Sequence, residues 1–537
     1  MEKPSIFDVP LLKDEVTQYL SSRDLAHCSR VSKQWSTWFR PTLWRALDFG
    51  SSDFDECTLQ KHRDHVKTIL RLNIAHLAAD DFPLPNLWSL EASSSLNIFD
   101  SHVLLTEISG LRTFLRIAPT VLRTLKIEFW LINPDLDEMK NFDLTSRQFL
   151  DPFFVLQLFQ ACSNLDSLIL RVRSYLTILY QDEHLREVLR KQDESANRGM
   201  EQMPKAQLRE LGLYVRCFGY GLAILPLFLA QCPHLQVFRL GDLETMGDLK
   251  TTGILEQIVS VFEDGKCPKL RDLQLGGVLG KDTEELNTRF IRSLGQGSGD
   301  DSLNSNAGDL ERQCGLESIT VKGTRALSTF VMALTQHQAT TLTSMDIIHY
   351  HNTRLADLVS LVSSLPKLRT LGITVNLRSQ NGRTPEEDLA LHKGWVFLEL
   401  KRLTLYYILE HGTEVVSQTC PSEKLQSRFM HYVFPQTARL SELEEWTLGR
   451  NIELLCLSNG FLSWLPGLKR LKSLTYIARS KNSMDTVEAE WMIENWPSLI
   501  HVALLSTDRD ALSETTLLAQ ERFVASLKEK RPWIRIE

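Results

Sequence analysis

Hydrophobic residues recur along most of the chain in the pattern L-x-x-L-x-L, in which Ile, Val, Met, Phe, Trp or Tyr can replace a later leucine. Side chains alternate between the two faces of a strand, so each L-x-L core predicts a short strand with one buried face. Twelve copies are found, and their first leucines lie 26 to 46 residues apart. They begin at Leu122, Leu165, Leu208, Leu235, Leu270, Leu316, Leu342, Leu368, Leu400, Leu443, Leu471 and Leu499. Two weaker copies surround Leu70–Leu72 and Leu87–Leu90.

Segments with helical periodicity precede several of these strands. Ile254, Ile258 and Val261, for example, lie on one helix face. Proline cannot continue a helix, and it marks the return to the strand at Cys232-Pro233, Cys267-Pro268, Leu365-Pro366 and Trp496-Pro497. The shorter spacings resemble those of leucine-rich repeats, which are about 20–29 residues long. We therefore predict an α/β solenoid over residues 66–537, with parallel strands on the concave face and helices outside.

The longer spacings require insertions between repeats. Residues 295–309 are rich in Gly, Ser, Asn and Asp and have almost no apolar content, which predicts a loop. Residues 378–393 are interpreted as a second long loop. Residues 184–206 are charged and predict a solvated helix that runs into a loop.

The first fifty residues follow a different pattern. An apolar helix face is formed by Leu12, Val16, Tyr19 and Leu20, and a second face is formed by Leu25, Cys28, Val31, Trp35 and Trp38. We expect Ser22 or Asp24 to cap the second helix and Pro41 to end it. A segment this small cannot bury all of its aromatic residues, so it needs a partner surface or a covering domain.

Residues 6–47 resemble an F-box. The resemblance rests on Pro10, Val16, Tyr19-Leu20, Asp24-Leu25, Val31-Ser-Lys-Gln-Trp35 and the closing Leu43-Trp44-Arg45-Ala46-Leu47. An F-box followed by irregular leucine-rich repeats is similar to the F-box/LRR proteins, in particular the divergent fungal families. The alternative is an ordinary helix pair that caps the solenoid.

The resemblance implies a non-catalytic substrate-recognition subunit of a Skp-cullin-F-box type ubiquitin ligase. Its partners would be a Skp-family adaptor, a cullin scaffold held through that adaptor, and an unknown protein substrate. The runner-up is an LRR scaffold protein with an F-box and no role in ubiquitination. Neither reading implies a cofactor or a metal.

Two sets of residues are predicted to bind these partners. We expect Pro10, Leu12, Leu20, Leu25 and Val31 to contact the adaptor and Trp35 to position them. Residues that flank the strand leucines should point outward on the sheet. They form the candidate substrate face: Arg171, Tyr214, Arg239, Gln274, Lys322, Thr374 and Tyr406. This set is basic on balance, which favours an acidic or phosphorylated partner.

Composition narrows the function classes. The chain has 60 Lys and Arg against 67 Asp and Glu, a net charge of −7, which argues against general binding of nucleic acid or anionic membranes. It has no secretory signal pattern and no run of about 18 apolar residues. Nine cysteines without a C-x-x-C pair favour a reducing compartment, so we expect a location in the cytosol or the nucleus.

Other chemical readings are weaker. Cys162, Cys232, Cys267 and Cys314 recur near repeat starts, where a small buried residue is expected, although a thiol enzyme is the alternative. The pairs His62/His65 and His349/His351 lack the further ligands of a zinc site. The glycines at 295, 297 and 299 lack the flanking strand and helix of a phosphate loop. The acid pairs 300–301, 386–387 and 444–445 are interpreted as solvated charge.

Overall fold

The computed structural model describes the repeats and most of the N-terminal helices, and every structural statement below concerns these residues. They are 15–17, 19–48, 61–73, 84–97, 121–132, 164–174, 206–215, 225–241, 248–276, 284–294, 315–322, 327–347, 355–376, 394–408, 430–449, 457, 462–478, 484–506 and 514–537. The three predicted insertions lie outside the described residues, apart from Ala206.

The chain forms two compact units. The first comprises Met1–Val261 with Lys266–Lys269, and the second comprises Phe262–Gly265 with Leu270–Glu537. The first unit begins with two helices, α2 (Ser22–Val31) and α3 (Lys33–Leu43). We call residues 15–43 the N-terminal module.

The rest of the first unit is a parallel sheet whose strands pair in chain order. The strands are β1 (Ala46–Asp48), β2 (Thr68–Asn73), β3 (Ser89–Asn97), β4 (Thr124–Ile132), β5 (Ser167–Ser174), β6 (Glu210–Val215) and β7 (Val237–Gly241). Its described helices are α8 (Leu225–Ala230) and most of α9 (Asp248–Glu263).

The second unit repeats this arrangement, again with parallel pairing in chain order. Its strands are β8 (Asp272–Gly276), β9 (Ser318–Lys322), β10 (Ser344–Ile347), β11 (Thr370–Asn376), β12 (Arg402–Ile408), β13 (Glu445–Gly449), β14 (Ser473–Ala478), β15 (His501–Ser506) and β16 (Arg535–Ile536). Its helices are α10 (Glu284–Ser293), α11 (Leu327–His337), α12 (Leu355–Ser364), α15 (Thr486–Asn495) and α16 (Glu514–Lys530), with the short 3-10 helix η8 (Leu462–Trp464) and helical residues 430–437.

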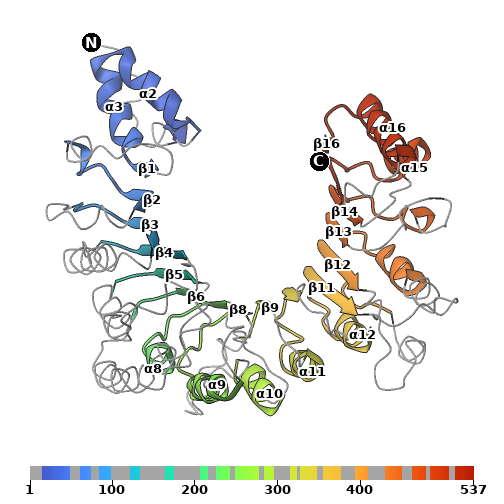
Figure 1. The fold of residues 1–537 in the computed structure, drawn as a ribbon, viewed down its shortest axis with the longest axis horizontal. Helices are drawn as coiled ribbons and strands as arrows, with labels where there is room; N and C mark the ends of the chain where they lie inside the picture. The colour runs from blue at the N-terminus through green and yellow to red at the C-terminus, as the bar shows by residue number, and fades with distance from the viewer. Residues whose placement is uncertain are drawn as a thin grey trace, which may run out of the picture. The chain divides into compact units, whose positions relative to one another are not determined.

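In the second unit the core lies between the strands and the described helices that cover one face of them (Figure 1). In the repeat that contains β11, Leu368, Leu371 and Ile373 are all buried. The preceding helix α12 buries Leu358 and Leu361 against the same layer. Every one of the twelve predicted L-x-L cores lies in a strand, and so do Leu70–Leu72 of the first weak copy and Leu90 of the second. The predicted α/β solenoid is confirmed.

Within each unit, a backbone hydrogen-bond pattern joins adjacent repeats. The carbonyl at the second position of L-x-x-L-x-L accepts two consecutive N–H groups from the following repeat. The Lys401 carbonyl, for example, accepts from the backbone N–H groups of Glu444 and Glu445 at 2.8 and 2.9 Å. The same pattern begins at the Arg45 carbonyl, which accepts from Lys67 and Thr68. We call this pattern the carbonyl ladder.

Five local features differ from the sequence prediction. The second predicted helix is divided at Ser32 into α2 and α3. The helix α3 runs past Pro41 to Leu43, because Pro41 lies in its last turn, where the N–H of Trp44 bonds to the Arg40 carbonyl at 3.1 Å. Ser21, rather than Ser22 or Asp24, caps α2. The strands β1 and β16 were not predicted, and β1 starts inside residues 6–47, the segment predicted to be an F-box.

Candidate functional site

Side-chain caps define the helices of the N-terminal module. The Ser21 hydroxyl accepts a hydrogen bond from the Asp24 N–H at 3.2 Å, and the Asp24 carboxylate accepts one from the Ser21 N–H at 3.2 Å. The Ser21 hydroxyl also donates to the Asp24 carboxylate at 2.6 Å, and this bond, together with the one from the Ser21 N–H, holds the pKa of the Asp24 carboxyl below its usual value. Ser32 separates the helices and accepts a hydrogen bond from the Trp35 N–H at 3.1 Å. A single residue therefore ends α2 and caps α3, which fixes a tight turn between them.

The module buries few of its apolar side chains. Within its described residues only Leu25 and Phe39 are buried hydrophobic residues, and the Trp35 ring lies 5.4 Å from the Phe39 ring. In contrast, Tyr19 is 83% exposed and Val31 is 64% exposed. Large apolar side chains that are left in water on a small helical module are typical of a protein-binding surface.

The residues predicted to contact the adaptor differ in how exposed they are. Val31 is exposed and Leu20 is half-buried, so both side chains are available to a partner. Leu25 is only 6% exposed because it packs into the interior of the module. Its side chain is therefore not available for the predicted direct contact with the adaptor. Trp35 is half-buried. Pro10 and Leu12 lie outside the described residues.

The module leads directly into the sheet. Its last residues continue into β1, and the Trp44 ring stacks on the His62 ring, with 4.1 Å between centroids and 11° between planes. His62 is buried, and this burial lowers the pKa of its imidazole, with further lowering by the positive charge of Arg40. The stacked pair thus fixes the junction between the module and the first strands.

On the sheet of the first unit, four outward positions are Cα partners in one row: Glu128, Arg171, Tyr214 and Gly241. The Arg171 guanidinium carbon lies 4.9 Å from the centre of the Tyr214 ring, a cation–π contact. Only a glycine fits beside this ring, since a Cβ on Gly241 would lie 2.5 Å from Tyr214 Cδ1. Burial raises the pKa of the Tyr214 hydroxyl.

The predicted substrate face has less free charge than its sequence suggests. Arg239 forms an ion pair with Glu210, and Arg171 packs on Tyr214. Gln274 and Tyr406 are half-buried. Lys322 is the last residue of β9. Since the arginines have partners on the sheet itself, the basic balance of this set does not describe an open basic surface.

Thr374 requires a correction. It occupies an outward position of β11, but it is 3% exposed. Its side chain is short, and its Cα partner on β12 is the much larger Tyr406. Thr374 is therefore too deep in the sheet to contact a partner protein.

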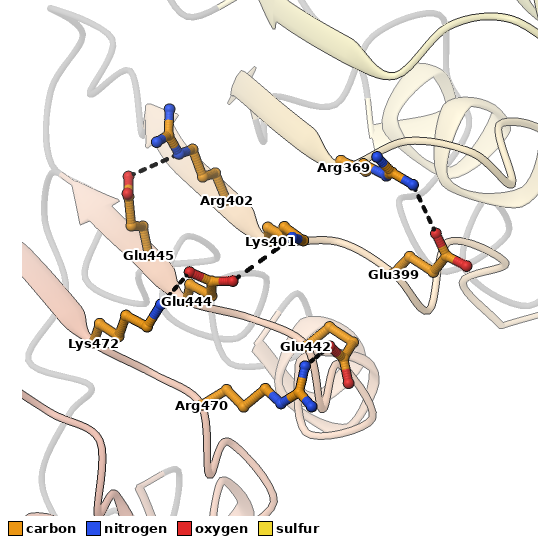
Figure 2. Close-up of polar contacts among 9 residues, drawn as sticks. All are labelled: Arg369, Glu399, Lys401, Arg402, Glu442, Glu444, Glu445, Arg470 and Lys472. Carbon is orange, nitrogen blue, oxygen red and sulfur yellow. Dashed lines mark hydrogen bonds and ion pairs between the residues drawn. The ribbon is translucent and has the colours of Figure 1, made fainter. Parts of the chain in front are cut away.

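A set of charged residues at the start of the strands was missed by the sequence prediction. In the second unit, Glu444 pairs with Lys472 at 2.6 Å and with Lys401 at 3.8 Å (Figure 2). The hydrogen bond from Lys472 holds the pKa of the Glu444 carboxyl below its usual value. All three residues directly follow the first leucine of their repeat. A comparison of this second position between repeats would have indicated that opposite charges lie side by side.

Neighbouring charges in Figure 2 are paired in the same way. Arg402 lies 3.1 Å from Glu445, Arg369 lies 3.6 Å from Glu399, and Arg470 pairs with Glu442. The charged side chains at this edge of the second unit are consequently paired with one another.

The described cysteines and histidines do not form a reactive site. Cys232 and Cys267 are buried at equivalent repeat positions, as predicted, and their Sγ atoms lie 3.3 Å from backbone carbonyls. Burial raises the pKa of the Cys267 thiol to about 12 and that of Cys232 well above its usual value, so both are protonated and inert at neutral pH. In the described residues no three His, Cys, Asp or Glu side chains converge as metal ligands do. Nor does any helix of this part combine the length and apolar character of a membrane span.

Comparison with known proteins identifies the N-terminal module. The F-box-like family model matches residues 13–50, which include the exposed Val31 and the junction with β1. The chain thus combines an F-box-like segment with a leucine-rich-repeat solenoid. No curated protein sequence matches this chain.

Several solved structures share the general fold at low identity. The structure of the Rad7 and Elc1 complex in yeast is 12% identical with a TM-score of 0.38, covering 95% of this chain and 98% of the other. A leucine-rich-repeat protein from Leptospira interrogans is 12% identical with a TM-score of 0.35, covering 90% and 98%. LegL7 from Legionella pneumophila, which also contains leucine-rich repeats, is 11% identical with a TM-score of 0.30, covering 86% and 98%. At this distance the partners of those proteins say nothing about the partners of this chain.

Proposed function

We propose that this chain is the substrate-recognition subunit of a Skp-cullin-F-box type ubiquitin ligase. The F-box-like segment docks on a Skp-family adaptor, which connects the chain to a cullin. The solenoid binds the protein to be ubiquitinated. The chain acts by binding rather than by catalysis, and it works in the cytosol or the nucleus.

The observation that carries this proposal is the F-box-like match over residues 13–50 together with the exposed apolar side chains there. Val31 and Tyr19 lie in water although the module has little core of its own. Covering them with a partner removes apolar surface from water, which contributes about 25 cal/mol per Å². An adaptor that covers this surface would therefore also stabilise the module.

The solenoid supplies the second half of the function. Among the described residues, the stacked parallel strands of each unit have one sheet face without covering helices, and its outward positions carry charged and aromatic side chains. Repeat proteins use such extended faces to bind other proteins. The alternative, an LRR scaffold that binds an adaptor without a ubiquitination role, shares this surface and differs only in recruiting no cullin.

The first prediction concerns adaptor binding. Replacing Val31 with Glu should weaken capture of the Skp-family adaptor by about ten- to a hundredfold, because burying a valine contributes about 1.5–3 kcal/mol and each 1.4 kcal/mol is about a factor of ten. The measurement is co-purification of adaptor and cullin with the full-length chain, wild type against Val31→Glu.

A matched control is available on the second unit. Val487 lies in α15 and is 58% exposed, close to the exposure of Val31, so Val487→Glu makes the same change on another helix. It should leave capture of both proteins unchanged. Equal adaptor capture by Val31→Glu and wild type would show that residues 13–50 do not bind an adaptor through this surface. Capture of the adaptor without a cullin would favour the scaffold.

A further inference from the structure

The carbonyl ladder places six side chains in a line at the start of the strands of the first unit. Each carries the second-position carbonyl that accepts the next pair of N–H groups. In order these residues are Arg45, Lys67, Trp88, Arg123, Asp166 and Arg209. We call them the strand-start row. Neighbouring parallel strands are about 4.8 Å apart, so the row extends over roughly 24 Å.

The cations of this row are not neutralised. Arg45, Lys67 and Arg209 are exposed, and no ion pair or side-chain hydrogen bond involves them within the described part of the chain. Arg123 donates a hydrogen bond from Nη1 to the Asn164 carbonyl at 2.8 Å, which orients its guanidinium without removing its charge. Asp166 is the one acid among the six residues.

Three nearby acids among the described residues already have partners of their own. Asp48 accepts hydrogen bonds from Arg71, and Glu91 is bound by Lys126. Asp64 lies 3.9 Å from Arg63. The strand-start row consequently has a net charge of +3 in a protein whose overall net charge is −7.

The equivalent positions of the second unit show the contrast. There Arg271 lies 3.2 Å from Glu317, and Glu444 is shared by Lys401 and Lys472. Both units use the same repeat position for charge, but only the first leaves that charge without partners. Ion pairs between repeats therefore account for the charged positions of the second unit and not for the cations of the strand-start row.

Two further features suit a peptide ligand. Trp88 lies between Lys67 and Arg123 in the row and is 57% exposed, and tryptophan is common among the residues that dominate protein interfaces. In three neighbouring repeats the next position supplies hydroxyl groups, because Thr68, Ser89 and Thr124 are Cα partners across β2, β3 and β4. The buried residues that follow them point inward, so these hydroxyls point outward beside the row.

We infer that the strand-start row binds an extended acidic peptide segment of the target protein. This inference rests on the proposed function and names its substrate class. At about 3.4 Å per residue, roughly seven residues in an extended conformation span the row. Acidic side chains pair with the four cations, and an apolar side chain packs on Trp88. Asp166 excludes an acid from the place opposite it.

The inference is tested by fluorescence anisotropy with the full-length chain and a fluorescein-labelled peptide, EDEFDEDE. The variant Lys67→Glu/Arg123→Glu/Arg209→Glu should bind it at least tenfold more weakly, and higher salt should weaken the wild type. The control Lys401→Glu/Arg470→Glu/Lys472→Glu makes the same charge change in the second unit and should bind within twofold of wild type. Trp88→Ala should weaken EDEFDEDE but not EDESDEDE, which lacks the apolar residue.

The outcomes separate the alternatives. Unchanged binding by the first triple variant, an equal loss in the control variant, or equal affinity for the neutral peptide QNQFNQNQ would each overturn the inference. Tighter binding of an eight-nucleotide dT oligonucleotide would assign the row to nucleic acid instead. The first triple variant should still capture the adaptor, because Val31 is unaltered. Failure of adaptor capture by the wild type would overturn the proposed function and leave the peptide result standing.

Discussion

At the scale of single residues, two repeats use the same tyrosine–glycine arrangement. Tyr214 lies over Gly241 in the first unit, and Tyr406 lies over Gly449 in the second. In each pair the two residues are Cα partners on adjacent strands, directly after the last strand leucine. The ring occupies the space in which a side chain of the next repeat would lie. The glycine is therefore required for close approach and not for an unusual backbone angle.

This arrangement predicts a conditional effect of mutation. Gly449→Ala should destabilise the second unit by about 1–3 kcal/mol, the usual penalty of overpacking, although alanine in an open strand position would stabilise it. In Tyr406→Ala/Gly449→Ala the clash is absent, so the double variant should be more stable than the two single losses add up to. Urea denaturation of the two single variants and the double variant measures this coupling, and strict additivity would contradict the packing described.

At the scale of elements, the turn between α2 and α3 depends on Ser32. Its backbone is extended, and its side chain caps α3 through the Trp35 N–H. Because Ser32 is the only residue between the two helices, its conformation sets how Val31 at the end of α2 is presented relative to α3.

Ser32→Ala should therefore loosen the module without affecting the second unit. Losing an N-cap hydroxyl costs about 1 kcal/mol, whereas Ser32→Asp keeps an acceptor and should retain most of the stability. Hydrogen exchange measured by mass spectrometry should show faster exchange over residues 22–43 in Ser32→Ala only. Faster exchange in the β11–β15 strands as well would show that the solenoid depends on the module.

At the scale of the whole molecule, the module and the repeats share one hydrogen-bonding system. The carbonyl ladder starts at Arg45, within the segment matched by the F-box-like family model, and β1 pairs with β2 at once. The Trp44–His62 stack lies at this junction. The module and the first strands should consequently unfold together.

The junction should weaken in mild acid. His62 has a folded-state pKa below its usual 6.5, because its burial disfavours the charged ring, as do the nearby charges of Arg40, His65 and Lys61. The unfolded chain then binds the proton more readily, so stability is present above about pH 6.5 and falls as the pH drops below that value. Urea denaturation at pH 7.5 and 5.5 measures this loss. His62→Phe keeps a stacked ring without a titrating group, and its loss should be smaller. An equal loss in both proteins would show that His62 does not contribute.

The sequence predicted the repeats well, because an inward leucine at every second strand residue leaves a period-two signal. It did not predict β16, since Ile534-Arg535-Ile536 is one residue shorter than L-x-x-L. The ion pairs could not be predicted from the sequence either. Lys472 and Glu444 are 28 residues apart, and only the strand register brings them together. Leu25 and Thr374 were misplaced because a helix face or strand alternation gives direction and not depth.

The chain-order stacking of strands also has a mechanical consequence. A force applied to the two ends of such a sheet loads the outermost strand first, and each strand is held only by its neighbours. The last strand, β16, has only two register pairs with β15, His501↔Arg535 and Val502↔Ile536, so it would peel away under a smaller load than the longer strands. Each following strand would then carry the force in turn. Extension would proceed as a series of small steps instead of one abrupt rupture.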